Sequence, residues 1–301
     1  ELCTLVRFDV ETGEQLVLSG HESWVRGLAF SPDGNTLYAA DFAGRLVWWP
    51  VTSEGPEPIR TIDAHDGFNR AVAVSPDGAT LATAGNDHLV RLWSAADGSP
   101  VGEFAGHESH VYNVLFHPGG EFLVSADLKG VVKQWDLASG ACVRDLDASK
   151  NYKYDKGFRA DIGGARSMAF DAAGTQLACG GVTNVTNAFA GVGNAAVVLL
   201  DWESGKEVQF HKDEGDLRGV AWGVAFHPDG YLIGAAGGGA GGFLCFWKPD
   251  QATPFFRFKL PNTARDMDLH PDGQSIAVAH YDSHLRIYRM TPQAEAAQQA
   301  S

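Results

Sequence analysis

The fold is decided by the stretch Ala64–Ser94, which reads AHDGFNRAVAVSPDGATLATAGNDHLVRLWS. At its centre lies the turn Ser75–Gly78, in which Pro presets φ for the first corner, Asp binds its own backbone and Gly accepts a positive φ. Short apolar segments rich in β-forming residues follow the turn, and Thr80–Ala84 and Leu89–Trp93 are each predicted to be a strand. The stretch therefore predicts short strands connected by tight turns.

The turn recurs along the chain at spacings typical of a structural repeat. Its glycines are 44, 42, 54, 56 and 43 residues apart. The six turns are Ser31–Gly34, Ser75–Gly78, His117–Gly120, Asp171–Gly174, His227–Gly230 and His270–Gly273. A second mark, usually an aromatic residue, lies further along each unit, at Phe8, Trp49, Trp93, Trp135, Leu200, Trp247 and Tyr288. Four-stranded repeats of this length are typical of propeller blades, so we expect an all-β fold.

The units resemble those of the WD-repeat β-propeller family. Gly20–His21, Ala64–His65 and Gly106–His107 occupy the Gly-His position of that repeat, and Trp135–Asp136 is its Trp-Asp pair. The resemblance covers roughly residues 3–290. It implies a β-propeller of four-stranded antiparallel blades that forms a single domain over residues 1–290. The Ala/Gln-rich tail at 291–301 is expected to be mobile.

In this family a His, a Ser or Thr, an Asp and the Trp form a hydrogen-bonded structural tetrad. The residues that match it fully are His65, Thr83, Asp87 and Trp93. In the third unit Lys129 occupies the Asp position, and Asp127 is displaced from it by two residues. The fourth to sixth units lack the Gly-His mark, so we expect them to pack less regularly.

The number of blades is left open between seven and six. Six turns join a first to a second strand, whereas seven marks lie in third strands, so residues 3–18 supply only a third and a fourth strand. Either seven blades close, with two strands upstream of Glu1, or six close and residues 14–18 complete the last sheet. Phe8–Asp9 is typical of a third strand, which favours seven. We expect a strand from the N-terminal side to complete the last sheet, because closure hides sheet edges.

The charge and composition exclude several classes of partner. Thirty-seven acidic against 23 basic side chains give a formal net charge of −14. Such a charge repels phosphate backbones and anionic membranes, which disfavours nucleic-acid binding and a membrane partner. No apolar run approaches the roughly 20 residues of a membrane span. The four cysteines lie far apart, as is typical of small buried residues in a reducing compartment, so a cytoplasmic location is expected.

Alignment of the units on their turns reveals a position that favours partner binding. This position, one residue after Val25 in the first unit, holds Arg26, Arg70, Tyr112, Arg166, Trp222 and Arg265. In a propeller the first strand lines the channel, so these residues would gather at the channel mouth. Arg grips carboxylate or phosphate with two parallel hydrogen bonds, and Tyr and Trp are frequent in binding hot spots. The alternative is structural, with each Arg pairing an acid of its own blade, as Asp266 or Asp268 could pair Arg265.

A second candidate lies in the insertion at residues 150–163, on the same predicted face. Residues 150–166 carry five basic and two acidic side chains, a net charge of +3. The residues expected to contact a partner are Lys153, Tyr154, Lys156, Phe158 and Arg159. A basic, aromatic surface attracts an acidic or phosphorylated segment. The alternative is a solvated loop that only covers the adjacent blades.

These observations predict a non-enzymatic protein-interaction scaffold that binds an acidic or phosphorylated protein segment on its top face. The common nucleophile, zinc and phosphate-loop motifs are absent from the sequence, and no cofactor or metal is expected. The alternative is a hydrolase or lyase with its pocket at the channel mouth. Its candidate acids and bases are Asp41, Asp266, His280 and Asp282.

Overall fold

The computed structural model describes residues 3–51, 57–187, 192–212, 218–239 and 241–291. The chain divides into two compact units, residues 1–146 and 147–301, and each is described by itself. The single domain predicted for residues 1–290 stays a prediction. The predicted tail at 291–301 lies, after Thr291, outside the described residues.

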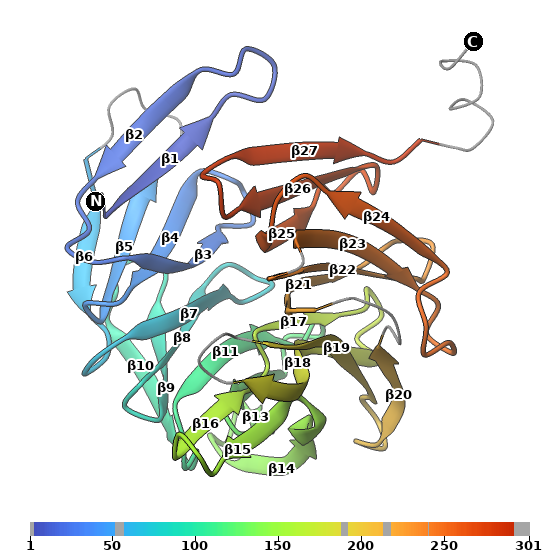
Figure 1. Cartoon of the computed structure of the whole chain (residues 1–301). Helices are drawn as coiled ribbons and strands as arrows, with labels where there is room; N and C mark the ends of the chain where they lie inside the picture. The colour runs from blue at the N-terminus through green and yellow to red at the C-terminus, as the bar shows by residue number, and fades with distance from the viewer. Residues whose placement is uncertain (1–2, 52–56, 188–191, 213–217, 240, 292–301) are drawn as a thin grey trace. The chain divides into compact units, whose positions relative to one another are not determined.

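The first unit contains a hairpin and three four-stranded antiparallel sheets (Figure 1). The hairpin is β1 (Thr4–Phe8) and β2 (Gln15–Ser19). Sheet 1 contains β3 (Val25–Phe30), β4 (Thr36–Asp41), β5 (Arg45–Pro50) and β6 (Arg60–Asp63). Sheet 2 contains β7 (Asn69–Val74), β8 (Thr80–Gly85), β9 (Leu89–Ser94) and β10 (Pro100–Ala105). Sheet 3 contains β11 (Val111–Phe116), β12 (Phe122–Asp127), β13 (Val131–Asp136) and β14 (Cys142–Asp147), whose last residue belongs to the second unit.

The second unit continues the pattern after a short helix and a hairpin. The 3₁₀ helix η1 is Ser149–Asn151, and the hairpin is β15 (Tyr152–Asp155) and β16 (Ala160–Gly163). Sheet 4 contains β17 (Ser167–Phe170), β18 (Gln176–Asn187), β19 (Val192–Asp201) and β20 (Glu207–Lys212). Sheet 5 contains β21 (Val220–Phe226), β22 (Leu232–Gly238), β23 (Gly241–Trp247) and β24 (Phe256–Leu260). Sheet 6 contains β25 (Ala264–Leu269), β26 (Ser275–His280) and β27 (Leu285–Arg289).

The all-β propeller class predicted from the repeats is confirmed, and the turns explain why. All six turn glycines have positive φ, between 67° and 84°. In each turn the glycine N–H donates to the carbonyl three residues earlier, as Gly78 does to Ser75 over 2.8 Å. The hairpin β1–β2 and six sheets of three or four strands are present among the described residues. The number of blades that close stays a prediction.

The register of the sheets repeats as regularly as the turns. In every sheet the marked residue of the third strand lies opposite a Leu or Ile of the second strand. The pairs are Leu37–Trp49, Leu81–Trp93, Leu123–Trp135, Leu177–Leu200, Leu232–Trp247 and Ile276–Tyr288. One cluster in the first unit joins Trp48 and Leu46 of sheet 1 to Leu81 and Trp93 of sheet 2. The core therefore lies between neighbouring sheets.

Neighbouring first strands approach closely because small residues stand where they meet. A Cβ on Gly27 of β3 would lie 2.9 Å from the Cα of Ala71 in β7. A Cβ on Gly223 of β21 would lie 2.8 Å from the backbone nitrogen of Met267 in β25. Within each unit, side chains on consecutive first strands are thus brought together.

Candidate functional site

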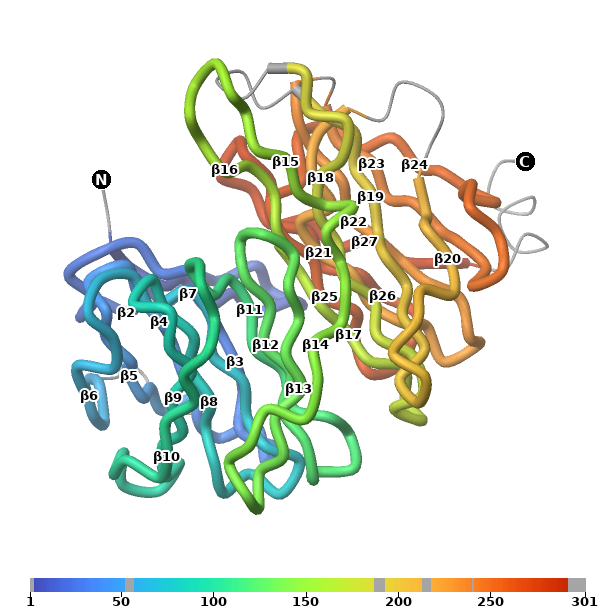
Figure 2. Tube along the Cα trace, turned by 90° about the horizontal axis from the view of Figure 1, so that it is seen from below, coloured from blue at the N-terminus to red at the C-terminus, as the bar shows by residue number. Residues whose placement is uncertain are grey.

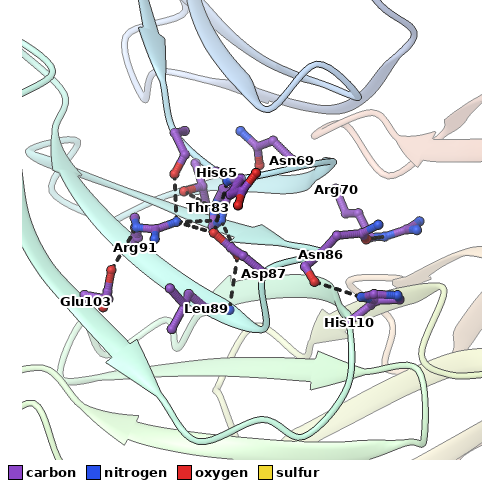
Figure 3. A network of polar contacts seen from close by, with 12 residues as sticks. His65, Asn69, Arg70, Thr83, Asn86, Asp87, Leu89, Arg91, Glu103 and His110 are labelled. Carbon is purple, nitrogen blue, oxygen red and sulfur yellow. Dashed lines mark hydrogen bonds and ion pairs between the residues drawn. The ribbon is translucent and has the colours of Figure 1, made fainter.

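Three hydrogen bonds join the four residues of the predicted tetrad in sheet 2. Figure 3 labels three of these residues, His65, Thr83 and Asp87. His65 Nδ1 lies 2.8 Å from Asp87 Oδ1, and His65 Nε2 lies 2.8 Å from Thr83 Oγ1. The indole N–H of Trp93 donates to the same Thr83 oxygen over 2.9 Å. Burial opposes ionisation of Asp87, but hydrogen bonds from His65 and Arg91 hold its pKa well below the ordinary value. The network links β8 and β9 to the segments that carry His65 and Asp87. These four side chains therefore have a structural role.

Sheets 1 and 3 build a similar network, in which the Asp lies two residues closer to the turn than Asp87 does in sheet 2. In sheet 3 His107 lies 3.1 Å from Asp127 and 2.7 Å from Ser125, to which Trp135 donates over 2.8 Å. Asp127, which ends β12, therefore takes the role that alignment placed at Lys129. In sheet 1 His21 binds Asp41 over 2.8 Å, and Trp49 donates directly to His21 over 3.3 Å. Sheet 1 has Ala39 where sheets 2 and 3 have the hydroxyl, so its Trp contacts the His without a bridging side chain.

The second unit departs from this network. The fourth to sixth units lack the Gly-His mark, and less regular packing was predicted for them. His211 of β20 packs beside Trp247, with ring centroids 5.9 Å apart. His211 Nε2 and Trp247 Nε1 are buried and have no hydrogen-bond partner among the described residues. In sheet 6 the hydroxyl of Tyr288 lies 3.2 Å from His280 Nε2.

The position singled out on the first strands coincides with a β-bulge. In five sheets the register shifts across this residue, so it has no direct partner on the second strand. The bulge residues are Arg26, Arg70, Tyr112, Trp222 and Arg265. Arg166 immediately precedes β17, and its N–H donates to Gly180. A bulge re-aims a side chain relative to its neighbours on the strand. We call these six residues the bulge set.

In the first unit Arg70 is surrounded by aromatic rings. Its guanidinium carbon lies 4.2 Å from the ring centroid of Tyr112, the next member of the bulge set. It also lies 5.3 Å from the ring of Phe68 and 5.6 Å from that of Phe42. Its Nε donates to the side-chain oxygen of Asn86. Arg70 and Tyr112, which the alignment placed at equivalent positions, therefore lie in contact in the structure. The sequence did not predict the rings of Phe42 and Phe68 beside Arg70.

In the second unit Trp222 lies within reach of two arginines of the bulge set. The guanidinium carbons of Arg166 and Arg265 are 6.0 Å and 5.4 Å from its ring centroid. Arg265 also lies 4.9 Å from the ring of Tyr281, which is 70% exposed. Arg265 is exposed and forms no ion pair with any described residue, Asp266 and Asp268 included. The three aligned positions of this unit thus form one cation–aromatic cluster.

Sequence reasoning missed the aromatic residues that surround the bulge set. Phe42 stacks on Phe68 with centroids 4.3 Å apart, and Trp24, which is 70% exposed, lies 6.5 Å from Phe42. One backbone hydrogen bond recurs here, from the residue after the second strand to the residue two before the bulge. It joins Phe42 to Trp24, Asn86 to Phe68, Leu128 to His110 and Tyr281 to Thr263. Aligning these two positions would have revealed the surface.

The insertion at 150–163 forms an ordered hairpin rather than a loop, because Asp155 accepts the N–H groups of Gly157 and Phe158 at its turn. Lys153 donates over 2.5 Å to the carbonyl of Val185 in β18. The hairpin lies beside β18 (Figure 2). Tyr154 and Phe158 are 48% and 58% exposed, and Lys156 and Arg159 are exposed as well. The hairpin β15–β16 therefore presents two aromatic rings and two cations to solvent.

Three of the four candidate acids and bases of the alternative enzyme are held in the interactions below, and the fourth, Asp266, accepts the N–H of Met267. Asp41 is buried against His21. Asp282 forms two hydrogen bonds with Arg286, which hold its pKa well below the ordinary value. Burial lowers the pKa of His280, which contacts the carbonyl of Asn262. No group of three potential metal ligands occurs among the described residues.

Two further predictions can be compared with the structure. None of the four cysteines forms a disulfide, but only Cys179 and Cys245 are buried, so the expected burial is wrong for the exposed Cys142. Among the described residues, no helix has both the length and the apolar composition to cross a membrane.

Comparison with known proteins gives the same assignment as the geometry. The family model described as "WD domain, G-beta repeat" matches residues 13–49, 56–94 and 98–136. Telomerase protein component 1 from Rattus norvegicus is 30% identical over 99 residues, and that from Mus musculus is 33% identical over 99 residues. Each match covers 33% of this chain and 4% of the relative, so the chain spans a small part of these proteins. Three repeats of the chain therefore match the WD-repeat family, and its sheets are those of an all-β propeller.

Proposed function

We propose that the chain is a non-enzymatic scaffold whose bulge set binds an acidic or phosphorylated segment of a partner protein. WD-repeat propellers generally serve as protein-interaction scaffolds. The relatives are named as a protein component of telomerase, and a component of an assembly is in keeping with such a role. The acidic or phosphorylated partner is inferred from this chain's own residues.

The observation that carries the proposal is the cluster of Arg166, Trp222 and Arg265. An aromatic ring contacts a guanidinium through its face, which leaves the in-plane N–H groups of Arg265 available to an anion. Those N–H groups match the two oxygens of a carboxylate or phosphate. Arg265 combines this arrangement with exposure and with the lack of an ion pair among the described residues. The cluster is therefore suited to an anion that arrives from solution.

The hairpin β15–β16 extends the same proposal. Its exposed Tyr154 and Phe158 provide area for stacking, while Lys156 and Arg159 add positive charge. These groups belong to an ordered element that is anchored by Lys153 to β18. A rigid surface that combines rings and cations loses little conformational entropy when it binds a flexible acidic segment.

The test replaces Arg166 and Arg265 together by Glu. Binding is measured by fluorescence polarisation with two labelled peptides of equal length, one rich in glutamate and one carrying phosphoserine. We expect at least a tenfold loss of affinity for the peptide that binds, with a nearly unchanged melting temperature. The matched control is Lys206→Glu with Lys248→Glu, which changes the net charge equally at exposed positions of the same unit.

Three outcomes would contradict the proposal. Equal affinity of the double variant and its control would show that the bulge set does not contact the anion. A large fall in melting temperature of the double variant alone would show that these arginines are structural. Preferential binding of a labelled RNA over both peptides would replace the protein partner with a nucleic acid.

A further inference from the structure

The connection between β8 and β9 carries a histidine where the neighbouring sheets carry glycine. The same three-residue connection ends in Gly44 in sheet 1 and in Gly130 in sheet 3, with φ of 91° and 79°. In sheet 2 this position is His88, with φ of 68°. A residue other than glycine is strained in this left-handed region, and such strain is typical of functional positions. The backbone therefore indicates a role for this imidazole that glycine cannot fill.

The ring of His88 lies against the ring of His110, the residue that precedes β11. The two ring centroids are 5.2 Å apart, and the rings are inclined at 64° to each other. Both residues are half-buried, so solvent reaches them. Neither belongs to a tetrad, and the side chain of His88 forms no hydrogen bond with any described residue. We call these two residues the histidine pair.

The hydrogen bond of His110 leaves one of its ring nitrogens suited to a ligand (Figure 3). His110 Nδ1 lies 2.8 Å from the carbonyl oxygen of Asn86. A carbonyl can only accept, so in the neutral ring Nδ1 carries the proton and Nε2 keeps its lone pair. The side-chain oxygen of the same Asn86 accepts from Nε of Arg70. A histidine whose second nitrogen is fixed by a backbone carbonyl is the usual arrangement of a metal ligand.

The separation of the two rings fits one transition-metal ion between them. An imidazole nitrogen lies about 2.0–2.1 Å from Zn²⁺, so two imidazoles on a tetrahedral ion have ring centroids about 5 Å apart. The observed separation of 5.2 Å agrees with this value. The described residues bring no third His, Cys, Asp or Glu to the pair. The remaining coordination positions are therefore left to ligands that the described part of the chain does not supply.

Charge determines which ligand completes such a site. Two neutral imidazoles leave the ion with its full positive charge, and Arg70 adds a further cation to the same surface. Asp87, the acid next to His88 in the chain, is already bound to His65. An anionic ligand is therefore favoured, and a carboxylate is a common zinc ligand beside two histidines.

We propose that His88 and His110 hold a divalent ion of the class that imidazole prefers, such as Zn²⁺, and that a carboxylate of the bound acidic segment completes its coordination. This inference rests on the function proposed above, because the segment supplies the anionic ligand. The pair lies beside the bulge set, since Asn86 links His110 to Arg70 and Arg70 contacts Tyr112. Binding of the segment thereby depends on a metal ion.

The first test measures Zn²⁺ binding to the metal-free protein by isothermal titration calorimetry. We expect His88→Gly to lower the affinity for Zn²⁺ at least tenfold. Because glycine adopts this φ without strain, the variant should melt at nearly the same temperature, which separates loss of binding from loss of folding. The matched control is His284→Gln, since the imidazole of His284 is exposed and contacts Asp282 rather than a second histidine. It should bind Zn²⁺ like the unchanged protein.

The second test follows the labelled glutamate-rich peptide by fluorescence polarisation, with Zn²⁺ and after chelation by EDTA. For the unchanged protein we expect EDTA to lower the affinity for the peptide at least tenfold. The His88→Gly variant should bind the peptide equally weakly with and without EDTA. A peptide with glutamine in place of every glutamate keeps the length and loses the carboxylates. Its binding should not respond to EDTA.

The outcomes separate this inference from the function proposed above. Equal affinity of H88G and H284Q for Zn²⁺ would overturn the inference, because the ion would then lie elsewhere. Zn²⁺ binding at the pair with no effect of EDTA on the peptide would also overturn it, because the ion would not contact the segment. The proposed function stands in both cases if Arg166→Glu with Arg265→Glu still weakens peptide binding. Peptide binding that responds to EDTA and to H88G but not to that double variant would refute the bulge set and support the metal site. Absence of peptide binding under every condition would refute both.

Discussion

Replacing Thr83 by Val should strongly destabilise sheet 2, although the two side chains have nearly the same shape. The hydroxyl of Thr83 is the shared partner of His65 Nε2 and Trp93 Nε1, and the side chain is 0% exposed. Valine fills the same space without either hydrogen bond. Two buried polar atoms are then left without a partner, and water has no ready access to them.

The size of the effect follows from these two atoms. A buried donor or acceptor left unsatisfied costs about 1–3 kcal/mol. Two such groups give an expected loss of about 2–6 kcal/mol in the free energy of unfolding of the first unit. Thr83→Ser keeps the hydroxyl and removes one methyl group, so its loss should be nearer to about 1 kcal/mol. The order of stability should therefore be wild type, T83S and T83V.

Urea denaturation and hydrogen exchange provide the measurement. Because repeats contact mainly their neighbours, exchange should accelerate most in β7, β8 and β9. Thr61→Val on the exposed face of β6 is the control, and it should change stability by less than about 0.5 kcal/mol. A loss for T83V no larger than that for T61V would refute the view that the hydroxyl holds the network together.

Two further predictions concern the acid limb of stability and the contact between first strands. The pKa of Asp87 is lowered in the folded state, so its carboxylate contributes stability above its unfolded value of about 3.8, and this contribution is lost as pH falls through the lower folded pKa. Asp87→Asn should lower the urea midpoint at neutral pH and make the midpoint fall less steeply below about pH 4. Asp66→Asn, at an exposed site, is the control and should keep the wild-type dependence of the midpoint on pH. Parallel pH dependences of D87N and the wild type would contradict this. Gly223→Ala places a Cβ 2.8 Å from the backbone nitrogen of Met267 and should destabilise the second unit by about 1–3 kcal/mol in urea denaturation. Gly239→Ala, with nothing within 4 Å, is its control, and equal midpoints would show that β21 and β25 separate without cost.

The sheets were predictable because each depends on residues close together in the chain. In the turn Ser75–Gly78, the residue types Pro, Asp and Gly themselves favour the backbone conformation of the turn. The marked residue, such as Trp93, then follows at a distance set by two short strands. The turn occurs six times and the mark seven times, so even the fourth sheet, with Leu200 in place of Trp, has the same register.

The candidate site was only partly predictable because it depends on geometry that spacing does not reveal. Alignment found Arg70 and Tyr112, since equivalent positions on neighbouring first strands lie close together. It assigned the Asp position to Lys129 because it used the sheet 2 spacing, whereas Asp127 reaches His107 from two residues earlier. The strand pair at 152–163 was missed because a hairpin turn built on Asp155 lacks the Pro-Asp-Gly signal.

The bulge at the start of the first strands has a consequence for how such a protein can diversify. Five of its residues, among them Tyr112, Trp222 and Arg265, stand outside the ladder of paired residues. Exchanging one of them changes the side chain presented there while the hydrogen bonds on both sides of it persist. The paired strands and the chemistry of these positions can therefore change separately, through single replacements at five equivalent places.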